Sequence, residues 1–318
     1  MPSSEQEELL MECSMPNGGM KTSLDEPVLR PVPGDISRRK TLVSLILFLL
    51  VMIVSAYVTV VVNDNRPDPS EHPPLPDVVL KSMHFHFYPG YICAASLVFL
   101  SSTFVITASL HKYRHVIFRR YFSSIAMLYL WRNVCMLVTS IPVTHTNLVC
   151  AAKTNGSFYA RIKQALVIVS TLGSYTDAES TGVTCGDFMY SGHTITFIYL
   201  AFHITKYSRN LGHILHPFCW MIAAVGIFSL MASFFHYTMD VAVSLALAPL
   251  CFTLHEVLVE NPSLRRKFAA FRLFYPLMNY LESDRNHLNC AVQNEYDWSL
   301  VKPALTKYLC YPCSQTKP

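Results

Sequence analysis

Six segments of this sequence are each long and apolar enough to cross a lipid bilayer, which takes about 20 residues of helix. They lie near residues 41–62, 88–110, 123–142, 188–205, 217–235 and 239–259. Within the hydrocarbon of a bilayer the backbone N–H and C=O groups must bond to one another, so such segments are expected to be helices. The composition agrees, because 52% of the residues are hydrophobic and 14% are charged. The sequence therefore predicts an all-α membrane protein with six transmembrane helices.

Basic residues beside these segments predict their orientation, because Lys and Arg are enriched on the cytosolic side of membrane helices. With six spans, four basic clusters fall on one side: Arg38, Arg39 and Lys40; Lys112, Arg114, Arg119 and Arg120; Lys206 and Arg209; and Arg265, Arg266 and Lys267. Both termini are therefore expected to be cytosolic. Residues 63–87, 143–187 and the junction near 236 fall on the luminal or extracellular side. The apolar run at 165–172 is too short to span and is expected at the membrane interface.

The predicted organisation has three parts. Residues 1–40 form a cytosolic disordered tail, residues 41–260 a six-span membrane domain, and residues 261–318 a cytosolic C-terminal tail. The first residues carry Glu5, Glu7 and Glu8 in place of a basic segment and an apolar core, so no signal peptide is expected. The net charge of +4 is spread over short clusters. Because no basic face with interleaved aromatic residues is present, nucleic acid is not an expected partner.

Two short polar motifs stand at the ends of the apolar segments. Residues 185–194 read Cys-Gly-Asp-Phe-Met-Tyr-Ser-Gly-His-Thr and place His193 among hydroxyl and backbone N–H groups that can hold an anion. Residues 236–240 place His236 and Asp240 four positions apart, on one face if they are helical. A carboxylate fixes the tautomer of a neighbouring histidine and stabilises its charged form. The two motifs suit transfer of a phosphoryl-type group through a phosphohistidine.

The order of these motifs resembles the lipid phosphate phosphatase superfamily, and the longer forms resemble the sphingomyelin synthase family. Two earlier stretches carry the same resemblance: Pro74-Leu75-Pro76-Asp77, and Arg119-Arg120-Tyr121-Phe122 with Leu128-Tyr129-Leu130-Trp131-Arg132. The resemblance covers about residues 60 to 260. With six spans, His193 begins the fourth and His236 ends the fifth. The active site is therefore expected at the luminal or extracellular face.

The resemblance implies a sphingolipid synthase that moves phosphocholine from phosphatidylcholine to ceramide and gives sphingomyelin and diacylglycerol. In this reading His236 is the nucleophile, Asp240 orients it, and His193 exchanges protons with the leaving and incoming hydroxyl groups. No cofactor is implied, since the donor phospholipid supplies the activated group. The two partners are the lipid donor and the ceramide acceptor in the bilayer, and homo-oligomer formation stays open.

Further residues are assigned to substrate binding with less support from the pattern. Arg132 falls near the middle of the third span, where a charge is costly and needs a partner or a polar cavity. It is read as a phosphate contact, as half of a structural pair, or as a side chain that extends to the membrane interface. Asp187 is read as a substrate contact or as the cap of span four. Ser191 and Tyr190 complete the set. Aromatic residues that could enclose a choline are Tyr129, Trp131, Phe188, Tyr190, Phe235 and Tyr237.

Of the ten cysteines, Cys150 and Cys185 fall on the non-cytosolic side, where a disulfide between them would tether a loop to the site. Asn155-Gly156-Ser157 on the same side is a glycosylation sequon. Cys310-Tyr-Pro-Cys313 is a lone CxxC, so no metal is expected. Together with Cys290, these cysteines are read as palmitoylation sites.

Three alternatives stay open. The donor headgroup could be ethanolamine or inositol, although the chain leaves no room for the extra N-terminal domain of the ethanolamine-transferring relative. The acceptor could be water, which would make the protein a phospholipase C or lipid phosphatase; the arginine expected upstream of the nucleophile is absent, since Ser229, Leu230 and Met231 stand there. A transporter or scaffold is the third alternative. A luminal site fits the Golgi and the plasma membrane equally.

Overall fold

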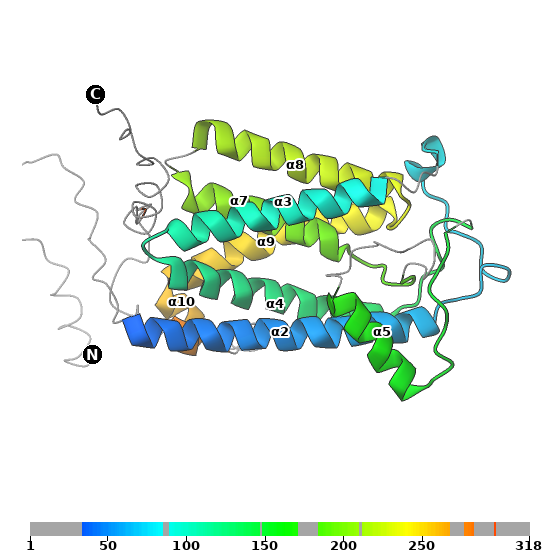
Figure 1. Ribbon diagram of the computed structural model, residues 1–318, viewed down its shortest axis with the longest axis horizontal. Helices are drawn as coiled ribbons and strands as arrows, with labels where there is room; N and C mark the ends of the chain where they lie inside the picture. The colour runs from blue at the N-terminus through cyan, green and yellow to red at the C-terminus, as the bar shows by residue number, and fades with distance from the viewer. Residues whose placement is uncertain are drawn as a thin grey trace, which may run out of the picture.

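The structure is a computed structural model that describes residues 34–84, 89–146, 148–170, 184–209, 212–267, 277–282 and 296. These residues are helical or irregular and form no extended strand. The long helices run side by side along the molecule (Figure 1). They are α2 (Gly34–Asp64), α3 (Pro89–Leu110), α4 (Arg114–Val138), α7 (Gly192–Tyr207), α8 (Gly212–Ala232) and α9 (Thr238–Glu260). The shorter ones are η1 (Leu80–Ser82), α5 (Phe158–Ser170), α10 (Pro262–Lys267) and α12 (Met278–Leu281).

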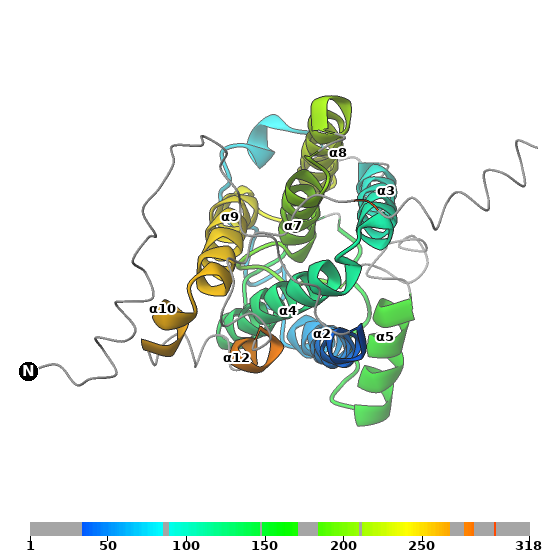
Figure 2. The ribbon, with the colours of Figure 1, turned by 90° about the vertical axis from the view of Figure 1, so that its left-hand side faces the viewer.

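Helix α7 lies at the centre of the bundle. It packs against α3, α8, α9 and α4, while α2 packs on α4 and α5 along one side. The end view shows the helices around it (Figure 2). Its residues Ile195, Phe197, Tyr199 and Leu200 are at most 1% exposed, which fits a helix enclosed by others.

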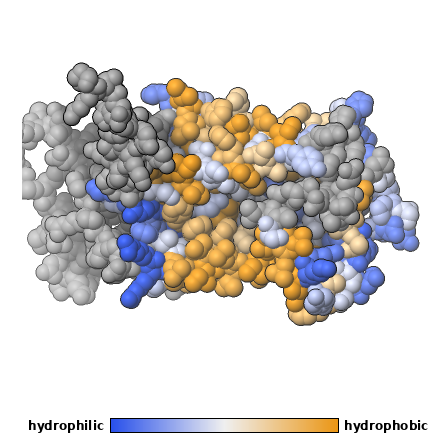
Figure 3. Space-filling view, viewed as in Figure 1, coloured by the Kyte–Doolittle hydropathy of each residue, from blue (hydrophilic) through white to orange (hydrophobic). Residues whose placement is uncertain are grey.

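Five of the long helices are long and apolar enough to cross a membrane: α2, α3, α4, α8 and α9. Apolar side chains form a band across the bundle, with hydrophilic ones at both ends (Figure 3). The chain is therefore an integral membrane protein. Helix α7 stands at the fourth predicted span, 188–205, but it has 16 residues and starts at Gly192. The predicted start was four residues early because residues 188–191 form the turn that carries the Ser191 cap.

Helix α4 extends further towards the cytosolic side of the predicted topology than the sequence suggested. We expected Arg119 and Arg120 in a loop, but both lie in α4 and are 1% exposed. Only residues 111–113 separate α3 from α4. The reason is tertiary, since both guanidinium groups pair with acidic side chains from the C-terminal third of the chain. As a result Arg132 lies in the last two turns of α4 and not at the middle of a span.

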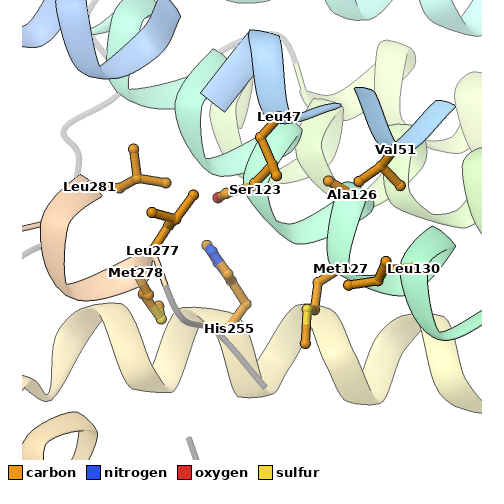
Figure 4. A pocket seen from close by; sticks show the side chains of 10 residues that line it. All are labelled: Leu47, Val51, Ser123, Ala126, Met127, Leu130, His255, Leu277, Met278 and Leu281. Atoms are coloured by element: carbon orange, nitrogen blue, oxygen red, sulfur yellow. The ribbon is translucent and has the colours of Figure 1, made fainter. Parts of the chain in front are cut away.

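Part of the predicted C-terminal tail packs on this end of the bundle. Glu282, which follows α12, approaches Arg119 to 3.1 Å and Arg120 to 3.7 Å. Tyr296 donates a hydrogen bond to the carbonyl of Tyr207 at 3.0 Å. A cavity of about 80 Å³ lies between α2, α4, α9 and α12, and His255 points into it (Figure 4). This end is therefore closed by segments distant in sequence.

Helix α5 crosses α2 near the opposite end of the bundle (Figure 1). Ala165 packs against Ala56 and Val60 of α2, whereas Tyr159 and Leu166 are 80% and 62% exposed. The 13-residue helix is too short to span, as predicted for the apolar run in this region. Residues 171–172 of that run lie outside the described residues.

Candidate active site

The turn between α8 and α9 carries the pair of His236 and Asp240. Nδ1 of His236 lies 3.3 Å from Oδ2 of Asp240, and both side chains are 1% exposed. We expected the pair to share a helix face, with His236 ending a span. Instead His236 lies after the end of α8 and before the start of α9, where Asp240 is the third residue. The carboxylate reaches His236 because it folds back over the start of the helix as a cap.

Each oxygen of Asp240 has a defined partner. Oδ2 also accepts a hydrogen bond from the backbone N–H of Tyr237 at 3.1 Å, and Oδ1 accepts one from Met189 at 3.1 Å. Met189 adopts a positive φ of 103° and Phe234 one of 56°, both unfavourable for side chains of this size. Strained backbone on either side of the pair indicates that the surrounding contacts hold it in one shape.

The His193 motif meets α9 through two serines. The backbone N–H of Ser191 donates to Oγ of Ser244 at 2.7 Å, and Ser244 donates to the carbonyl of Asp240 at 2.7 Å. Ser191 is the N-cap of α7, since its side chain accepts from the N–H of Thr194 at 3.2 Å. His193 is the second residue of α7, two positions after Ser191, whose backbone N also lies 3.3 Å from the carbonyl oxygen of Asp240. The structure therefore brings His193, His236 and Asp240 together.

Arg132 holds the turn that precedes α7. Its Nη2 lies 2.9 Å from the Asp187 carboxylate and 3.1 Å from the Asp187 carbonyl. Its Nε donates to the carbonyl of Tyr190 at 3.0 Å. Of the roles considered for Arg132, the structure shows the structural pair, which it forms with Asp187. Asp187 does not cap α7, because Ser191 does.

A close approach between α4 and α7 explains the glycine of the Ser-Gly-His motif. The hydroxyl of Tyr129 donates to the carbonyl of Gly192 at 3.1 Å and lies 2.9 Å from Oγ1 of Thr196. A Cβ at Gly192 would meet this hydroxyl at 3.1 Å and the Arg132 guanidinium carbon at 3.4 Å. A side chain here would press on the groups beside His193.

A cavity of about 220 Å³ reaches this cluster from the side of the bundle. Charged and polar groups beside the motifs line one part of it, namely Tyr129, Arg132, Asp187, His193 and Thr196, and the hydroxyls of Ser55, Thr59 and Thr184 also reach its wall. Apolar side chains line the rest, including Phe48 and Met52 of α2, Leu97 of α3 and Ile168 of α5. His193 is partly exposed to it, whereas His236 is not among its lining residues. Such a cavity fits a molecule with one polar and one apolar part.

The proposed choline-binding aromatics have different surroundings. Tyr129 lines the cavity, and Trp131 is 39% exposed. Phe188, Phe235 and Tyr237 are buried by packing. The rings of Phe188 and His236 meet edge-on, with 6.2 Å between their centroids. The Tyr190 hydroxyl donates to the carbonyl of Leu128 at 2.8 Å. The structure thus brings only Tyr129 of this set to the cavity wall.

A disulfide joins Cys150 to Cys185, the pairing that the sequence left open, with 5.6 Å between the Cα atoms. The N–H of Cys185 donates to the side chain of Asn63 at 3.0 Å, which ties the motif to the end of α2. Asn155 is exposed in a turn with a positive φ of 51°, and its glycosylation stays a prediction. Cys290, Cys310 and Cys313 lie outside the described residues. Among the residues that the structure does describe, no three His, Cys, Asp or Glu side chains gather as a metal site.

Sequence reasoning missed three residues that hold the site. Asp77 binds Thr238 through both its oxygens, at 2.8 Å each. The Tyr237 hydroxyl, read above as an aromatic contact, accepts from the N–H of Leu75 and faces the carbonyls of Pro142 and Val143. Ser244 is the third. Only Asp77 had a signal, as the last residue of the Pro-Leu-Pro-Asp stretch.

Comparison with known proteins gives this geometry a context. Residues 184–257 match the model of the PAP2 superfamily C-terminal region, which includes both histidines and Asp240. The chain is 31% identical to sphingomyelin synthase-related protein 1 of mouse and of human, over 85% of its length. It is 27% identical over 92% of its length to phosphatidylcholine:ceramide cholinephosphotransferase 1 of rat. The chain is therefore similar over most of its length to proteins named for sphingomyelin synthesis and for cholinephosphotransfer to ceramide.

This relationship confirms the resemblance that the motifs indicated. The chain spans 55% and 63% of the two synthase-related proteins and 70% of the rat transferase. The names of these relatives agree with a transferase of sphingolipid metabolism. Since the curated relatives are longer, the activity of this chain is argued separately below.

Proposed function

We propose that this protein is a sphingolipid synthase that transfers phosphocholine from phosphatidylcholine to ceramide through a phosphohistidine at His236. The observation that carries the proposal is the buried contact between Nδ1 of His236 and Asp240, whose carbonyl accepts from the N–H of Ser191 in the turn before His193. With Nδ1 facing a carboxylate, Nε2 is the nitrogen left to attack phosphorus.

In the first step, Nε2 of His236 forms a bond to the phosphorus of the donor, and the bond from phosphorus to the diacylglycerol oxygen breaks. His193 gives a proton to that oxygen, so diacylglycerol leaves neutral. Asp240 stabilises the positive charge that develops on the His236 ring. Because His236 is 1% exposed, water is kept from the intermediate until an acceptor arrives.

In the second step, the primary hydroxyl oxygen of ceramide attacks the same phosphorus and the bond to His236 breaks. His193 takes the proton from that hydroxyl and returns to its starting state. Since one group acts as acid and then as base, we expect a rate that falls on both the acid and the alkaline side. A rate independent of pH across the neutral range would contradict the assignment of His193.

The cavity supports a lipid donor and acceptor. Its apolar part, between α2, α3 and α5, suits acyl chains, and its polar part places a headgroup beside His193. Arg132 supplies a positive charge to the wall while it holds the turn through Asp187. Tyr129 presents a ring and a hydroxyl on the same wall, where a quaternary ammonium is attracted to an aromatic face.

The topology completes the proposal. With α7 as a sixth span, both ends of the chain lie on the cytosolic side and His193 and His236 at the luminal or extracellular face. The Cys150–Cys185 disulfide supports this, because such bonds persist on the oxidising side of a membrane. The Golgi or the plasma membrane is then the compartment. Homo-oligomer formation stays a prediction.

A second headgroup has support of its own. The chain is more identical to the synthase-related proteins, at 31%, than to the cholinephosphotransferases, at 26–27%. Because the two groups of relatives carry different names, a headgroup other than choline stays open. Ethanolamine is the alternative to choline, inositol is a third headgroup, and water is the alternative acceptor. The cavity walls that the structure describes do not separate these headgroups.

The test is headgroup transfer by the purified chain in liposomes. Labelled ceramide is offered with phosphatidylcholine, phosphatidylethanolamine or phosphatidylinositol separately. We expect one labelled product with phosphatidylcholine, and none from His236→Ala. His255→Ala is the matched control, since His255 is also buried but lies towards the other end of α9.

Each other outcome corrects a separate part of the proposal. A product only with phosphatidylethanolamine or phosphatidylinositol changes the headgroup. Diacylglycerol release without a ceramide product makes water the acceptor. No turnover of any donor by folded protein rejects the enzyme and favours a transporter or scaffold.

A further inference from the structure

The loop between α2 and α3 binds the His236 turn from the side away from the cavity. Asp77, in this loop, accepts four hydrogen bonds, two from Thr238 of α9 and two from the loop itself. Its Oδ2 accepts from the N–H of Thr238 at 2.8 Å, and its Oδ1 from the Thr238 hydroxyl at 2.8 Å. Oδ1 also accepts from the N–H groups of Val79 and Leu80 at 3.0 and 3.1 Å. One carboxylate thus joins the start of η1 to the start of α9.

The residue that Asp77 binds is close to the reacting group. Thr238 is the first residue of α9 and lies two positions after His236. Its N–H is one of the first amide groups of the helix, which have no acceptor inside the helix. Asp77 supplies that acceptor, while Asp240 supplies the one for Tyr237. The turn of His236 is therefore fixed by a carboxylate on each side.

Asp77 itself does not reach the substrate cavity. It lines a separate hollow with Lys81, His145 and Phe234, and it is absent from the wall that contains His193. An effect of Asp77 on the reaction must therefore pass through Thr238 and the turn. The Tyr237 hydroxyl, which accepts from Leu75 of the same loop at 3.1 Å, gives a second attachment.

We propose that Asp77 is a positioning residue for the group transfer, and that it holds the His236 turn in reactive geometry through Thr238. This inference rests on the proposed function. Displacement of a reacting group by about 1 Å can lower the reaction rate about 100-fold. A contact two residues from the proposed nucleophile can therefore change the rate strongly. A substrate contact would change KM, whereas a positioning residue changes kcat.

The experiment measures kcat and donor KM for the full chain in liposomes, with Asp77→Asn, Thr238→Val and Thr238→Ser. In Asp77→Asn an amide N–H replaces one of the two acceptors. We expect kcat to fall about 10- to 100-fold with little change in KM. In Thr238→Val, which removes only the hydroxyl, kcat should fall less than in Asp77→Asn. Thr238→Ser keeps a hydroxyl, so its kcat should lie close to that of the wild type. The double variant Asp77→Asn/Thr238→Val is no slower than Asp77→Asn, because both changes remove one interaction.

The matched control is Asp68→Asn in the same loop. Asp68 is exposed, and its carboxylate accepts hydrogen bonds from Ser70, at 3.0 Å from the N–H and 2.9 Å from the hydroxyl. We expect wild-type kcat from it. Hydrogen–deuterium exchange of peptides that cover residues 233–244 gives a second measurement without substrate. Exchange there should be faster in Asp77→Asn and unchanged in Asp68→Asn.

The outcomes separate this inference from the proposed function. Wild-type kcat and wild-type exchange in Asp77→Asn overturn the inference alone. A raised KM with unchanged kcat also overturns it, because Asp77 would then bind the donor. If wild-type protein turns over no donor, the proposed function fails, and the exchange data still decide whether Asp77 holds the turn. If Asp77→Asn does not fold, Thr238→Val and Thr238→Ser decide.

Discussion

The two ends of the helix bundle both bury charged side chains, but they neutralise them in different ways. At the end that holds the proposed catalytic residues, called the catalytic end below, Asp240 is bound by two backbone N–H groups and one histidine. At the opposite end, Glu282 faces the two guanidinium groups of Arg119 and Arg120. Backbone donors are fixed in place by the helix and the turn, and they carry no full charge. Full ion pairs instead bind distant segments together.

The comparison teaches where function and stability are located. The catalytic end has a cavity of about 220 Å³ with a partly exposed histidine, and strained residues beside the buried pair. The opposite end has a smaller cavity of about 80 Å³, closed by α12 (Figure 4). We therefore expect changes to the two histidines of the first end to remove activity with little loss of stability. Changes to the ion pairs of the second end should lower stability with little loss of activity.

The largest expected effect is at the nucleophile. His236→Ala should lower transfer by at least about 1,000-fold, because removal of one member of such a catalytic set costs nearly as much as removal of all. Its thermal midpoint in detergent should stay close to that of the wild type. His255→Ala, at the other end of the same helix, should keep its rate. Equal losses from both histidines would contradict the division between the two ends.

Next in size is the ion pair at the opposite end. Glu282→Gln removes the carboxylate charge that faces both Arg119 and Arg120, although Arg120 keeps its pair with Glu256. Breaking a buried pair costs about 3–5 kcal/mol. We expect a clear fall of the unfolding midpoint, with kcat per folded molecule unchanged. Glu260→Gln is the control, since Glu260 is exposed on the same side. A loss of kcat without a loss of stability would show that this end contributes to catalysis.

The disulfide is expected to have an intermediate effect. Cys150 and Cys185 are separated by 35 residues, and a loop of this size is stabilised by about 2–4 kcal/mol when closed. Cys150→Ser with Cys185→Ser should lower the thermal midpoint, and a reducing agent should do the same to the wild type alone. The backbone N–H of Cys185, which the substitution keeps, donates to Asn63, and the loss of the bond should loosen this attachment of the motif and lower activity as well. An unchanged midpoint would exclude the bond from the folded protein.

The smallest effect concerns pH and Asp77. Burial by itself would raise the pKa of the Asp77 carboxyl, but hydrogen bonds from Thr238, Leu80 and Val79 outweigh it, so the pKa lies below the usual 3.8. A depressed pKa gives stability that is present above 3.8 and is lost as pH falls through the lower value of the folded state. The difference in midpoint between wild type and Asp77→Asn should therefore shrink in acid. A difference that grows as pH falls would reverse the sign.

The sequence predicted much of the fold because membrane insertion depends on local hydropathy. The predicted segment at 88–110 agrees closely with α3, Pro89–Leu110. Predictions were weaker where charges lie near helix ends. Arg119 and Arg120 looked like a loop because nothing nearby in sequence neutralises them. The spacing of His236 and Asp240 indicated the right contact for the wrong reason, since the carboxylate caps the helix and does not share its face with the histidine.

What the sequence alone determined is the chemistry that is available: a membrane chain with two histidines and an aspartate in motifs of specific spacing. The tertiary structure decided which groups meet. Arg132 and Asp187 are 55 residues apart, Asp77 and Thr238 161, and Arg119 and Glu282 163. A local sequence pattern does not predict such contacts. The entropy cost of closing each loop is offset only when the whole bundle packs.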